Sequence, residues 1–558
     1  MNKNDELQDV RIGKVRIKGF KRFQRALTVD LNDRNNVLVG DNGAGKSTIL
    51  EAIHLALTGS FRSAPVGRAL SPYLFNANDV ARFIETSGTP SCVLPAIEIE
   101  VYFDGAAKGL LLDFDGAINS EHARETGFTF KIEPAKEFAE DLAVKVRSEH
   151  FDSLPIEYYA ASWMTFSSAP TFPRKLPMRS AFINPGGEWG SMRADERAVR
   201  SIVECLDPEI CRDIAGDARS SRDFLAGATS LTMANSAFDG IEALGGGSVV
   251  LSAKQCSGDS WIKDLTVQAG KVPFAHMGSG SQCLMQAQVA LRKQPRAKKP
   301  MVVLYEEPEN HLSHVHLRKL METVLAATGR QTVFSTHSSY VANKLDLGNL
   351  LLVSPEDGRC TRFADLDKST RDYFEKLAGF DTLRIVLADR SILVEGPSDE
   401  LIIQKLYRDS HGGRLPIDDG IDVICVNGLS FKRFLDLAKL VRKRVAVVTD
   451  NDGKPEAITE KYVGYSEMDG IKICSPATKR EGADGDGVKS WNTLEPELSN
   501  AIGWKVLASL LEYKCASEAE LIKHMESHKT DCALQLFTSD KELSCPSYIS
   551  DAFRWVEP

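Results

Sequence analysis

Two groups of residues in this 558-residue chain have the types and spacing needed for phosphate chemistry. The first is the segment Gly40-Asp41-Asn42-Gly43-Ala44-Gly45-Lys46-Ser47, which fits the pattern G-x-x-x-x-G-K-[ST] without a gap. Glycines let backbone N–H groups surround phosphate oxygens, the lysine reaches the terminal phosphates, and the serine hydroxyl can ligate Mg²⁺. The pattern predicts a nucleotide-phosphate site formed by Gly40, Asn42, Gly43, Gly45, Lys46, Ser47 and Thr48.

Two acids at the end of an apolar run are the expected partners of this loop. Residues 301–305 are apolar, and Glu306 and Glu307 follow them. Glu306 would hold the water shell of the metal ion, although this position is more often Asp, and Glu307 would orient or deprotonate the attacking water. His337 follows the next apolar run, 331–335, and suits a sensor of the γ-phosphate. The alternative is that both acids are solvent-exposed strand ends.

The second group consists of acids that follow two further apolar runs. Glu395 and Asp399 follow the first run, and Asp450 and Asp452 follow the second. Because open parallel sheets bind ligands at the carboxyl ends of their strands, these acids should meet at one edge. Carboxylates gathered in this way repel one another unless a hard cation such as Mg²⁺ or Mn²⁺ lies between them. Alternatively, they are turn residues and helix N-caps, which Asp399 could be.

Strands and helices must alternate to position these residues. The apolar patterns predict strands at 36–39, 96–103, 110–114, 127–132, 156–160, 301–305, 331–335, 391–395, 421–426, 445–449 and 470–474. They also predict a strand pair around 248–252 and 264–268, a loop at 278–281, and helices at 47–57, 314–327, 399–408 and 430–442. The expected chain is of the α/β class, with domains at 1–370 and 385–558 and a helical insertion at about 190–245.

The first domain resembles ABC-type ATPases in the order of its motifs. The Gly40 loop, the segment Gly278-Ser279-Gly280-Ser281-Gln282, the two acids and His337 follow one another as they do in that family. The resemblance implies that Ser279 and Gly280 contact the γ-phosphate of ATP bound by an opposite subunit, so that two heads complete each other's sites. It also implies that the helical insertion is a dimerisation element. Residues 158–167 contain no glutamine for the expected Q-loop.

The second domain resembles the Toprim domains of topoisomerases, primases and nucleases. The resemblance rests on E-G-x-x-D-E at 395–400 and D-x-D at 450–452, with Glu495 as a further metal ligand. The tail is similar to that of the overcoming lysogenization defect (OLD) family, in which a C-terminal lysine assists at the scissile phosphate. Lys529 fits that role by position, although an exposed helix lysine would look the same. Nearly the whole chain resembles this family.

The OLD resemblance implies an ATP-hydrolysing DNA endonuclease or nickase that depends on Mg²⁺ or Mn²⁺ and acts as a homodimer or larger homo-oligomer. Such proteins often act in defence against phage, as in Gabija-like systems, with a helicase-like subunit or with a retron reverse transcriptase and its RNA and DNA. An alternative is a nucleotide-gated sensor or scaffold that binds nucleic acid or a partner without cutting. A primase also stays open, although the chain lacks a zinc-binding cysteine cluster.

The overall composition limits these readings only weakly. The net charge of −9 argues mildly against a nucleic-acid binder, although basic runs at 292–299 and 442–444 are either local basic surfaces or solvated faces. The 11 cysteines include no C-x-x-C pair, which favours free thiols over a zinc site. The chain has no apolar run of 18 residues and begins with a polar segment, so we expect a cytoplasmic protein without a membrane segment.

Overall fold

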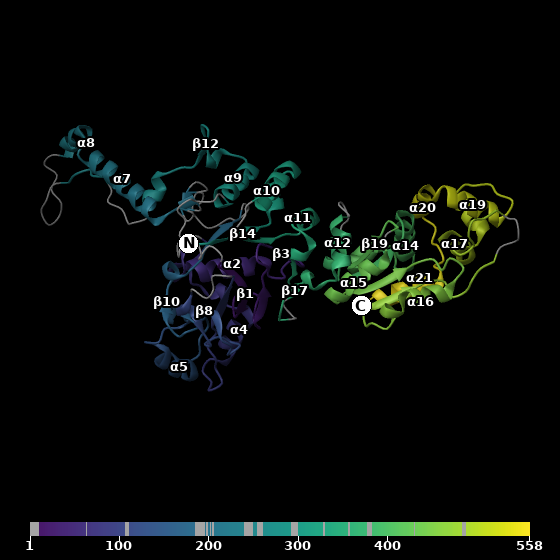
Figure 1. Ribbon diagram of the computed structural model, residues 1–558, viewed down its shortest axis with the longest axis horizontal. Coiled ribbons are helices and arrows are strands. Elements are labelled where there is room, and N and C mark those ends of the chain that lie inside the picture. The colour runs from purple at the N-terminus through teal and green to yellow at the C-terminus, as the bar shows by residue number, and fades with distance from the viewer. Residues whose placement is uncertain are drawn as a thin grey trace. The chain divides into compact units, whose positions relative to one another are not determined.

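The chain folds as two compact units, Met1–Leu345 with Val353–Cys360 and Asp346–Leu352 with Thr361–Pro558 (Figure 1). A computed structural model describes residues 10–62, 64–105, 111–184, 196, 199–200, 202–203, 206–238, 249–253, 260–291, 299–326, 330–354, 358–376, 382–428, 430–481 and 487–557. We describe each unit by itself. The limits expected from the sequence, 1–370 and 385–558, stay a prediction.

One layer of the first unit is an antiparallel sheet in the order β10-β9-β8-β6-β1-β2, with β7 paired to β8. Its strands are β1 (Arg11–Lys18), β2 (Leu27–Asp30), β6 (Ile97–Asp104), β7 (Asp115–Gly116), β8 (Glu125–Pro134), β9 (Tyr159–Thr165) and β10 (Pro170–Thr171). Successive side chains of a strand point to opposite faces of the sheet. In β1, Val15 and Ile17 point into the core and are fully buried, while Arg16 between them is not.

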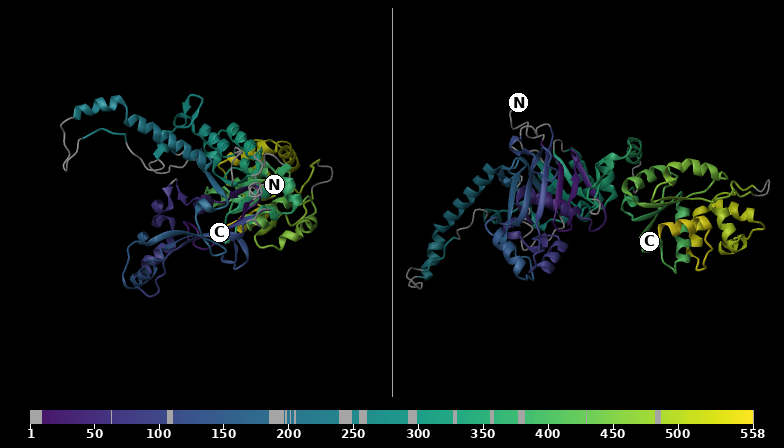
Figure 2. Two further views of the ribbon diagram at one scale, coloured as in Figure 1. Left: turned by 60° about the vertical axis from the view of Figure 1, so that its left-hand side comes forward. Right: turned by 90° about the horizontal axis from the view of Figure 1, so that it is seen from below.

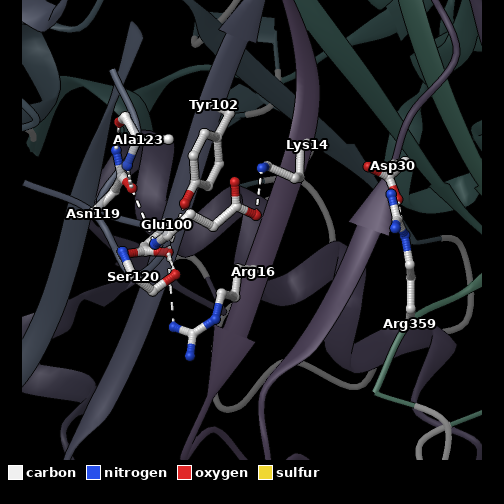
Figure 3. A network of polar contacts seen from close by, with 10 residues as sticks. Lys14, Arg16, Asp30, Glu100, Tyr102, Asn119, Ser120, Ala123 and Arg359 are labelled. Atoms are coloured by element: carbon white, nitrogen blue, oxygen red, sulfur yellow. Dashed lines mark hydrogen bonds and ion pairs between the residues drawn. The ribbon is translucent and has the colours of Figure 1, made fainter. Parts of the chain in front are cut away.

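A carboxylate buried in this sheet is neutralised locally. Glu100 is only 2% exposed, yet it accepts hydrogen bonds from the Tyr102 hydroxyl at 2.9 Å and from the Ser120 N–H at 2.7 Å (Figure 3). The guanidinium of Arg16 lies 3.7 Å from the same carboxylate. Because these partners satisfy its carboxylate oxygens, Glu100 stabilises the sheet and is not a candidate ligand-binding residue.

The second layer contains four parallel strands in the order β11-β14-β15-β3. These are β3 (Asn35–Val39), β11 (Arg179–Ile183), β14 (Met301–Glu306) and β15 (Gln331–Ser335). They are mostly buried, as expected of parallel strands that are covered on both faces, and the buried residues include polar ones such as Asn36 and Gln331. Helix α2 (Lys46–Thr58) packs against β11 and β14, and it ends at Gly59, whose left-handed conformation lets its N–H bond to Leu55.

Further helices and two hairpins belong to the described part of the first unit. The helices are α3 (Val66–Ala69), α4 (Ala77–Thr86), α5 (Ala139–Ser148), α7 (Pro208–Ala226), α8 (Thr229–Asn235), α9 (Ser279–Leu291), α10 (His314–Ala326) and α11 (Ser339–Lys344). Two hairpins pair β4 (Ser60–Phe61) with β5 (Ala64–Pro65) and β12 (Gln268–Ala269) with β13 (Val272–Pro273).

Four expectations for this unit were wrong. The strand expected at 156–160 begins only at Tyr159, because Ile156–Tyr158 forms a 3₁₀ turn. The apolar run 110–114 is not a strand where it is described, because Leu112–Phe114 forms a 3₁₀ turn. Residues 249–253 form no strand and the described hairpin lies later, at 268–273. The expected loop at 278–281 is instead the first turn of α9, since the Gly278 carbonyl accepts from the N–H groups of Ser281 and Gln282.

The second unit is built on a parallel sheet in the order β19-β18-β20-β21. These strands are β18 (Arg390–Val394), β19 (Ile421–Cys425), β20 (Arg444–Val448) and β21 (Ile471–Cys474), and β16 (Leu350–Leu352) pairs with β17 (Thr361–Arg362) in the same unit. The four sheet strands lie within one residue of the ranges expected from the sequence. Short apolar runs bounded by turns were sufficient to find them.

Ten helices of the second unit are described. They are α12 (Lys368–Lys376), α13 (Thr382–Leu387), α14 (Pro397–Ser410), α15 (Phe431–Val441), α16 (Pro455–Ser466), α17 (Leu494–Ile502), α18 (Trp504–Leu510), α19 (Glu518–Ser527), α20 (Lys529–Thr538) and α21 (Ser547–Val556). The C-terminal helices, yellow in Figure 2, share one core with the sheet, because Leu521, Leu536 and Phe553 pack in the same cluster as Ile392 and Ala446. Among the described helices, none has both the length and the hydropathy that crossing a membrane requires.

Candidate nucleotide and metal sites

The turn after β3 has the backbone needed to surround phosphates. Gly40, Gly43 and Gly45 all have positive φ values, of 150°, 78° and 104°. A Cβ atom on Gly45 would lie 2.5 Å from Cζ of Phe23, and one on Gly40 would lie 2.9 Å from the carbonyl oxygen of Val353. Both positions therefore require glycine for steric as well as conformational reasons. Asn42 is exposed at the tip of the turn.

The lysine of this turn is held by the loop itself. Lys46 Nζ donates to the carbonyl oxygens of Gly40 at 2.8 Å and of Asp41 at 3.0 Å, and the residue is 5% exposed. Burial lowers the pKa of Lys46, and the charges of Glu307, Asp41 and Glu309 oppose that shift. An arriving phosphate would replace two carbonyl acceptors by a charged one, which is a stronger partner for an ammonium group.

The structure brings Ser47 and Glu306 together, as expected for two groups that share one metal ion. Glu306 ends β14, and its carboxylate is hydrogen-bonded to the Ser47 hydroxyl and to the side-chain amide of Asn184. Burial raises the pKa of Glu306, and the charges of Glu51 and Glu307 add to the shift. Thr48 is buried beside Ser47 at the start of α2. These residues can hold a cation through one hydroxyl and one carboxylate oxygen.

Glu307 and His337 face each other at the same edge of the sheet. The His337 Nε2 atom lies 3.5 Å from Oε1 of Glu307. Glu307 has a left-handed backbone (φ 41°), and its N–H donates to the Ser335 carbonyl at 3.0 Å. Burial and the positive charge of Lys46 lower the pKa of His337. A strained acid beside a neutral histidine, within electrostatic range of Lys46, suits the orientation of a water near a terminal phosphate.

The proposed signature segment lies at the start of α9. The Gln282 side chain donates to the carbonyl oxygens of Phe274 at 2.7 Å and Met277 at 3.1 Å, and so fixes the turn before the helix. Gly280 lies in the first turn, whereas the side chain of Ser279 is outside the described atoms. The contact of Ser279 and Gly280 with an opposite subunit stays a prediction.

In the second unit, strand register places two of the predicted acids side by side. Strands β18 and β20 are parallel neighbours, and Leu393 pairs with Val447. Two residues further on, Glu395 is level with Thr449, whose hydroxyl donates to Oε1 of Glu395 at 2.6 Å. Asp450 follows directly.

These acids line one small hollow. Its walls include Glu395, Asp399, Thr449, Asp450 and Tyr548. Burial, together with the charges of neighbouring carboxylates, raises the pKa of Asp450 to about 8 and that of Asp399 to about 6. Like charges in a poorly solvated site favour protonation or a bound cation. Asp399 also accepts the Gly396 N–H at 2.9 Å, so it caps α14 as well as lining the hollow.

Glu495 and Lys529 lie within electrostatic range of this hollow. Lys529 Nζ is 2.9 Å from Oε1 of Glu495, whose side chain is 8% exposed. Burial lowers the pKa of Lys529, but the pairing with Glu495 and the charges of Asp399 and Asp450 outweigh it, and the net shift is upward. Helix α20 packs against α14, which is why residues 130 positions apart in sequence, Asp399 and Lys529, share one site.

Asp452 is the predicted ligand that the structure does not bring to this group. It is exposed, has a left-handed backbone (φ 48°), and is not among the residues that line the hollow. The middle residue, Asn451, is buried and donates to the carbonyl oxygens of Pro476 and Thr478, each at 3.0 Å. Asn451 therefore fixes the loop, while Asp452 points to solvent.

The donor set suits a hard divalent cation. Three carboxylates line the hollow, a fourth is paired with a lysine beside it, and oxygen ligands of this kind favour Mg²⁺ or Mn²⁺. Among the described residues, no three His, Cys, Asp or Glu side chains already stand close enough together to hold a metal ion. Mutual repulsion keeps such a set apart, so a cation would have to draw the carboxylates together.

Sequence reasoning gave no role to Asn184, Glu309 or Tyr548. Asn184 directly follows β11, so the rule that places ligands at strand ends could have found it. Glu309 lies two residues after Glu307, but it does not directly follow the apolar run, so the strand-end rule does not indicate it. Tyr548 reaches the hollow from α21, and no spacing in the sequence indicates that.

Comparison with protein families identifies both units. Residues 14–151 match an AAA domain, and residues 220–343 match an AAA domain described as a putative AbiEii toxin of a type IV toxin–antitoxin system. Residues 386–452, which include Glu395 and Asp450, match the Toprim domain of overcoming lysogenization defect-like proteins. The chain has the ATPase–Toprim architecture of the OLD family. The matches confirm the predicted family and, with the observed strands and helices, the predicted fold class.

Solved structures provide weaker likenesses to this OLD-type chain. The C-terminal regions of the OLD proteins of Xanthomonas campestris pv. campestris and Burkholderia pseudomallei are 21% and 19% identical, with TM-scores of 0.23 and 0.24. Each alignment covers 30% of this chain, and 92% and 97% of those chains. An SMC head bound to the C-winged helix domain of ScpA is 14% identical over 62% of this chain and 96% of its own, with a TM-score of 0.31. The family assignment rests on the domain matches. No curated protein matches the chain.

The glycine of the phosphate turn gives a direct test of the nucleotide site. Gly45→Ala should weaken binding of a fluorescent ATP analogue by at least about 10-fold and lower stability by about 1 kcal/mol, because the added Cβ meets Phe23 at a left-handed position. Gly67→Ala, in α3 with open space around its Cβ position, is the matched control and should leave both unchanged. Equal ATP affinities for the two variants would refute the assigned site.

Proposed function

We propose that this protein binds and hydrolyses ATP and cleaves phosphodiester bonds of DNA with a divalent cation, as an endonuclease or nickase. The observation that carries the proposal is the hollow in the second unit. Acids from two parallel strand ends and from the first turn of α14 line it, with the Glu495–Lys529 pair beside it. The OLD-like Toprim match over residues 386–452 supports phosphodiester chemistry at these acids.

Each group at the hollow has a role that its position allows. Glu395, Asp399, Asp450 and Glu495 would hold Mg²⁺ or Mn²⁺, with Asp452 kept as a predicted ligand that the present arrangement does not include. The bound cation would activate water and stabilise the leaving oxygen. Lys529 is half exposed, so its ammonium can leave Glu495 and face a phosphate where negative charge develops.

In the first unit, the proposed ATP site is formed by the Gly40 turn, Lys46 and Ser47. Glu306 would share a Mg²⁺ with Ser47, Glu307 would orient the attacking water, and His337 would sense the γ-phosphate. Ser279 and Gly280 of a second copy would complete the site. Because the AAA matches cover 14–151 and 220–343, both halves of this ATPase are represented in the chain.

A role in defence against phage is the biological setting that we propose. The OLD-like domain and the match to a domain described as a putative toxin support it. DNA would be the target, and a helicase-like subunit or a retron reverse transcriptase with its RNA and DNA would be the kind of partner. Co-purification from the native host, followed by mass spectrometry and nucleic-acid extraction, tests this setting, and recovery of the chain without any such partner would count against it.

The nuclease proposal makes a prediction about two acids. Replacing Glu395 and Asp450 together by Ala should reduce cleavage of supercoiled plasmid in Mg²⁺ or Mn²⁺ at least about 100-fold, because the cation loses ligands from both strands. ATP hydrolysis should continue, since the ATP site contains neither residue. Glu460→Ala, on the exposed surface of α16, is the matched control and should cleave normally.

Two outcomes would contradict this proposal. Unchanged cleavage by the double variant would place the chemistry elsewhere. An intact plasmid with the wild-type protein under every metal and nucleotide condition, with ATP hydrolysis present, would instead favour the nucleotide-gated sensor or scaffold.

We also propose that the helical insertion joins two copies of the chain. Helix α7 has no buried side chain in its described length, and Phe224 and Met233 are 83% and 71% exposed. The side chain of Asn235 exchanges two hydrogen bonds with the backbone of Leu251, which brings another exposed apolar residue beside α8. Exposed apolar side chains that gather in this way mark contact surfaces. We propose that a second copy of the chain covers this surface, because the proposed ATP site also needs Ser279 and Gly280 from a second copy.

Dimerisation through α7 and α8, which we call the arm, can be tested by replacing its exposed apolar side chains with polar ones. Phe224→Ser combined with Met233→Ser should shift the protein toward monomer in sedimentation velocity and slow ATP hydrolysis at least about 10-fold at low protein concentration, because each site lacks its opposite subunit. Leu112→Ser is the control, since Leu112 is 75% exposed but lies outside the arm. A double variant that sediments and hydrolyses ATP like the wild type would exclude the arm as the interface.

A further inference from the structure

An acid just beyond the proposed ATP site is hydrogen-bonded to the segment that follows β15. Glu309 lies in the 3₁₀ turn Pro308–His311, which follows β14 directly after Glu307. Proline at the first position and the left-handed Glu307 favour this turn, and the Asn310 N–H closes it on the Glu307 carbonyl at 3.1 Å. The turn directs the Glu309 side chain toward the segment that follows β15.

One oxygen of Glu309 accepts three hydrogen bonds from that segment. Its Oε1 atom accepts from the Thr336 hydroxyl at 2.6 Å, from the His337 N–H at 2.8 Å and from the Ser338 N–H at 3.2 Å. Two of these donors are backbone groups on either side of the His337 side chain. We call residues 307–311 the acid loop. A single carboxylate, that of Glu309, therefore joins the acid loop to the loop that carries His337.

At His337 the backbone N–H of this segment passes from the sheet to Glu309 as its acceptor. The N–H of Thr336 still donates to the carbonyl of Leu38 in β3, at 3.2 Å. Beyond it the chain leaves the sheet. The N–H of His337 donates to Glu309 instead, and the N–H of Ser338 is shared between Glu309 at 3.2 Å and the Thr336 hydroxyl oxygen at 2.9 Å. Without that carboxylate, the backbone that carries His337 would lose the acceptor that fixes its direction.

The other oxygen of Glu309 shows that this arrangement is costly. Oε2 is buried and has no hydrogen-bond partner among the described residues. A buried carboxylate oxygen without a donor opposes folding, so stability alone is a poor explanation for an acid at this position. The arrangement is more understandable if the acid places a group that acts on the nucleotide.

We propose that Glu309 is a positioning residue for ATP hydrolysis: by holding residues 336–338 to the acid loop, it sets His337 against Glu307. The 3.5 Å separation of His337 Nε2 from Glu307 Oε1 is the geometry that it maintains. This inference rests on the proposed ATPase function and adds to it a coupling between two loops. Lys46 in the neighbouring turn donates to the carbonyl oxygens of Gly40 and Asp41, and Glu309 acts on it through charge.

Three substitutions test the contact. Glu309→Ala should lower kcat for ATP hydrolysis by about 10–100-fold, because misplacing a catalytic group by about 1 Å has effects of this size. The Kd for ATP should change less than about 2-fold, since the hydrogen bonds of Lys46 go to Gly40 and Asp41, and the charge of Glu309 is the smallest of the three that act on Lys46. Glu309→Gln keeps a carbonyl acceptor and should stay within about 3-fold of the wild-type kcat. Glu322→Ala, on the exposed face of α10, is the matched control.

A double-mutant cycle separates positioning from general stabilisation. In a His337→Ala background, Glu309→Ala should reduce kcat by less than about 2-fold further, because the group that it positions is already absent. Independent, multiplicative losses would overturn the inference. If Glu309→Ala does not fold, Thr336→Val removes the hydroxyl that donates to Glu309 and accepts from the Ser338 N–H, and it should lower kcat by about 3–10-fold.

The two proposals fail in different ways. A wild-type protein that does not hydrolyse ATP, alone or with DNA, would overturn the ATPase proposal and the inference with it. A wild type that hydrolyses ATP, with Glu309→Ala retaining its full kcat, would overturn the role of Glu309 alone.

Discussion

Carboxylates that share a poorly solvated hollow repel one another, and the second unit is built around such a set. The register between β18 and β20 makes Glu395 level with Thr449 and Asp450, so the chain cannot form this sheet without bringing those acids together. The raised pKa values of Asp399 and Asp450 express the cost of that arrangement. The Thr449 hydroxyl, the Gly396 N–H and Lys529 offset part of the repulsion. A divalent cation would offset the rest, and that requirement links the fold to the proposed chemistry.

The first unit applies the same rule of parallel strands to a different ligand. The strands β3, β14 and β15 end at one edge and deliver the glycine turn, the Glu306–Glu307 pair and His337 to it. There, the charged groups already have neutral hydrogen-bond partners, since Lys46 bonds to carbonyls of its own loop and Glu306 to Asn184 and Ser47. Nucleotide binding would exchange these internal partners for phosphates and a metal ion. Glu309 adds a tie between two of the three loops.

Much of this arrangement could be predicted from the sequence. A glycine-rich pattern between an apolar run and a helix, and acids after short apolar runs, have direct physical meanings, and the strands of the second sheet lie within one residue of their expected positions. Other features depended on tertiary contacts. Whether Asp452 faces the hollow is decided by Asn451, which anchors the loop to residues 476 and 478.

Other errors came from patterns that are ambiguous in isolation. The glycine and serine residues at 278–281 have low helix propensity, yet they begin α9 because the carbonyl of Gly278 and the side chain of Gln282 fix the first turn. The run ending at Phe114 is apolar enough for a strand, but it forms a 3₁₀ turn with Leu112 exposed. Tyr548 reaches the hollow only through the packing of α21 on β20 and β21, which no local pattern contains.

The central claim is that Glu395 and Asp450 share a divalent cation. The most direct measurement is anomalous diffraction from crystals of the full chain grown with Mn²⁺. The account predicts a Mn²⁺ peak in the hollow, with carboxylate oxygens of both residues at about 2.0–2.4 Å. A structure at saturating Mn²⁺ with no ion within bonding distance of either residue would contradict it.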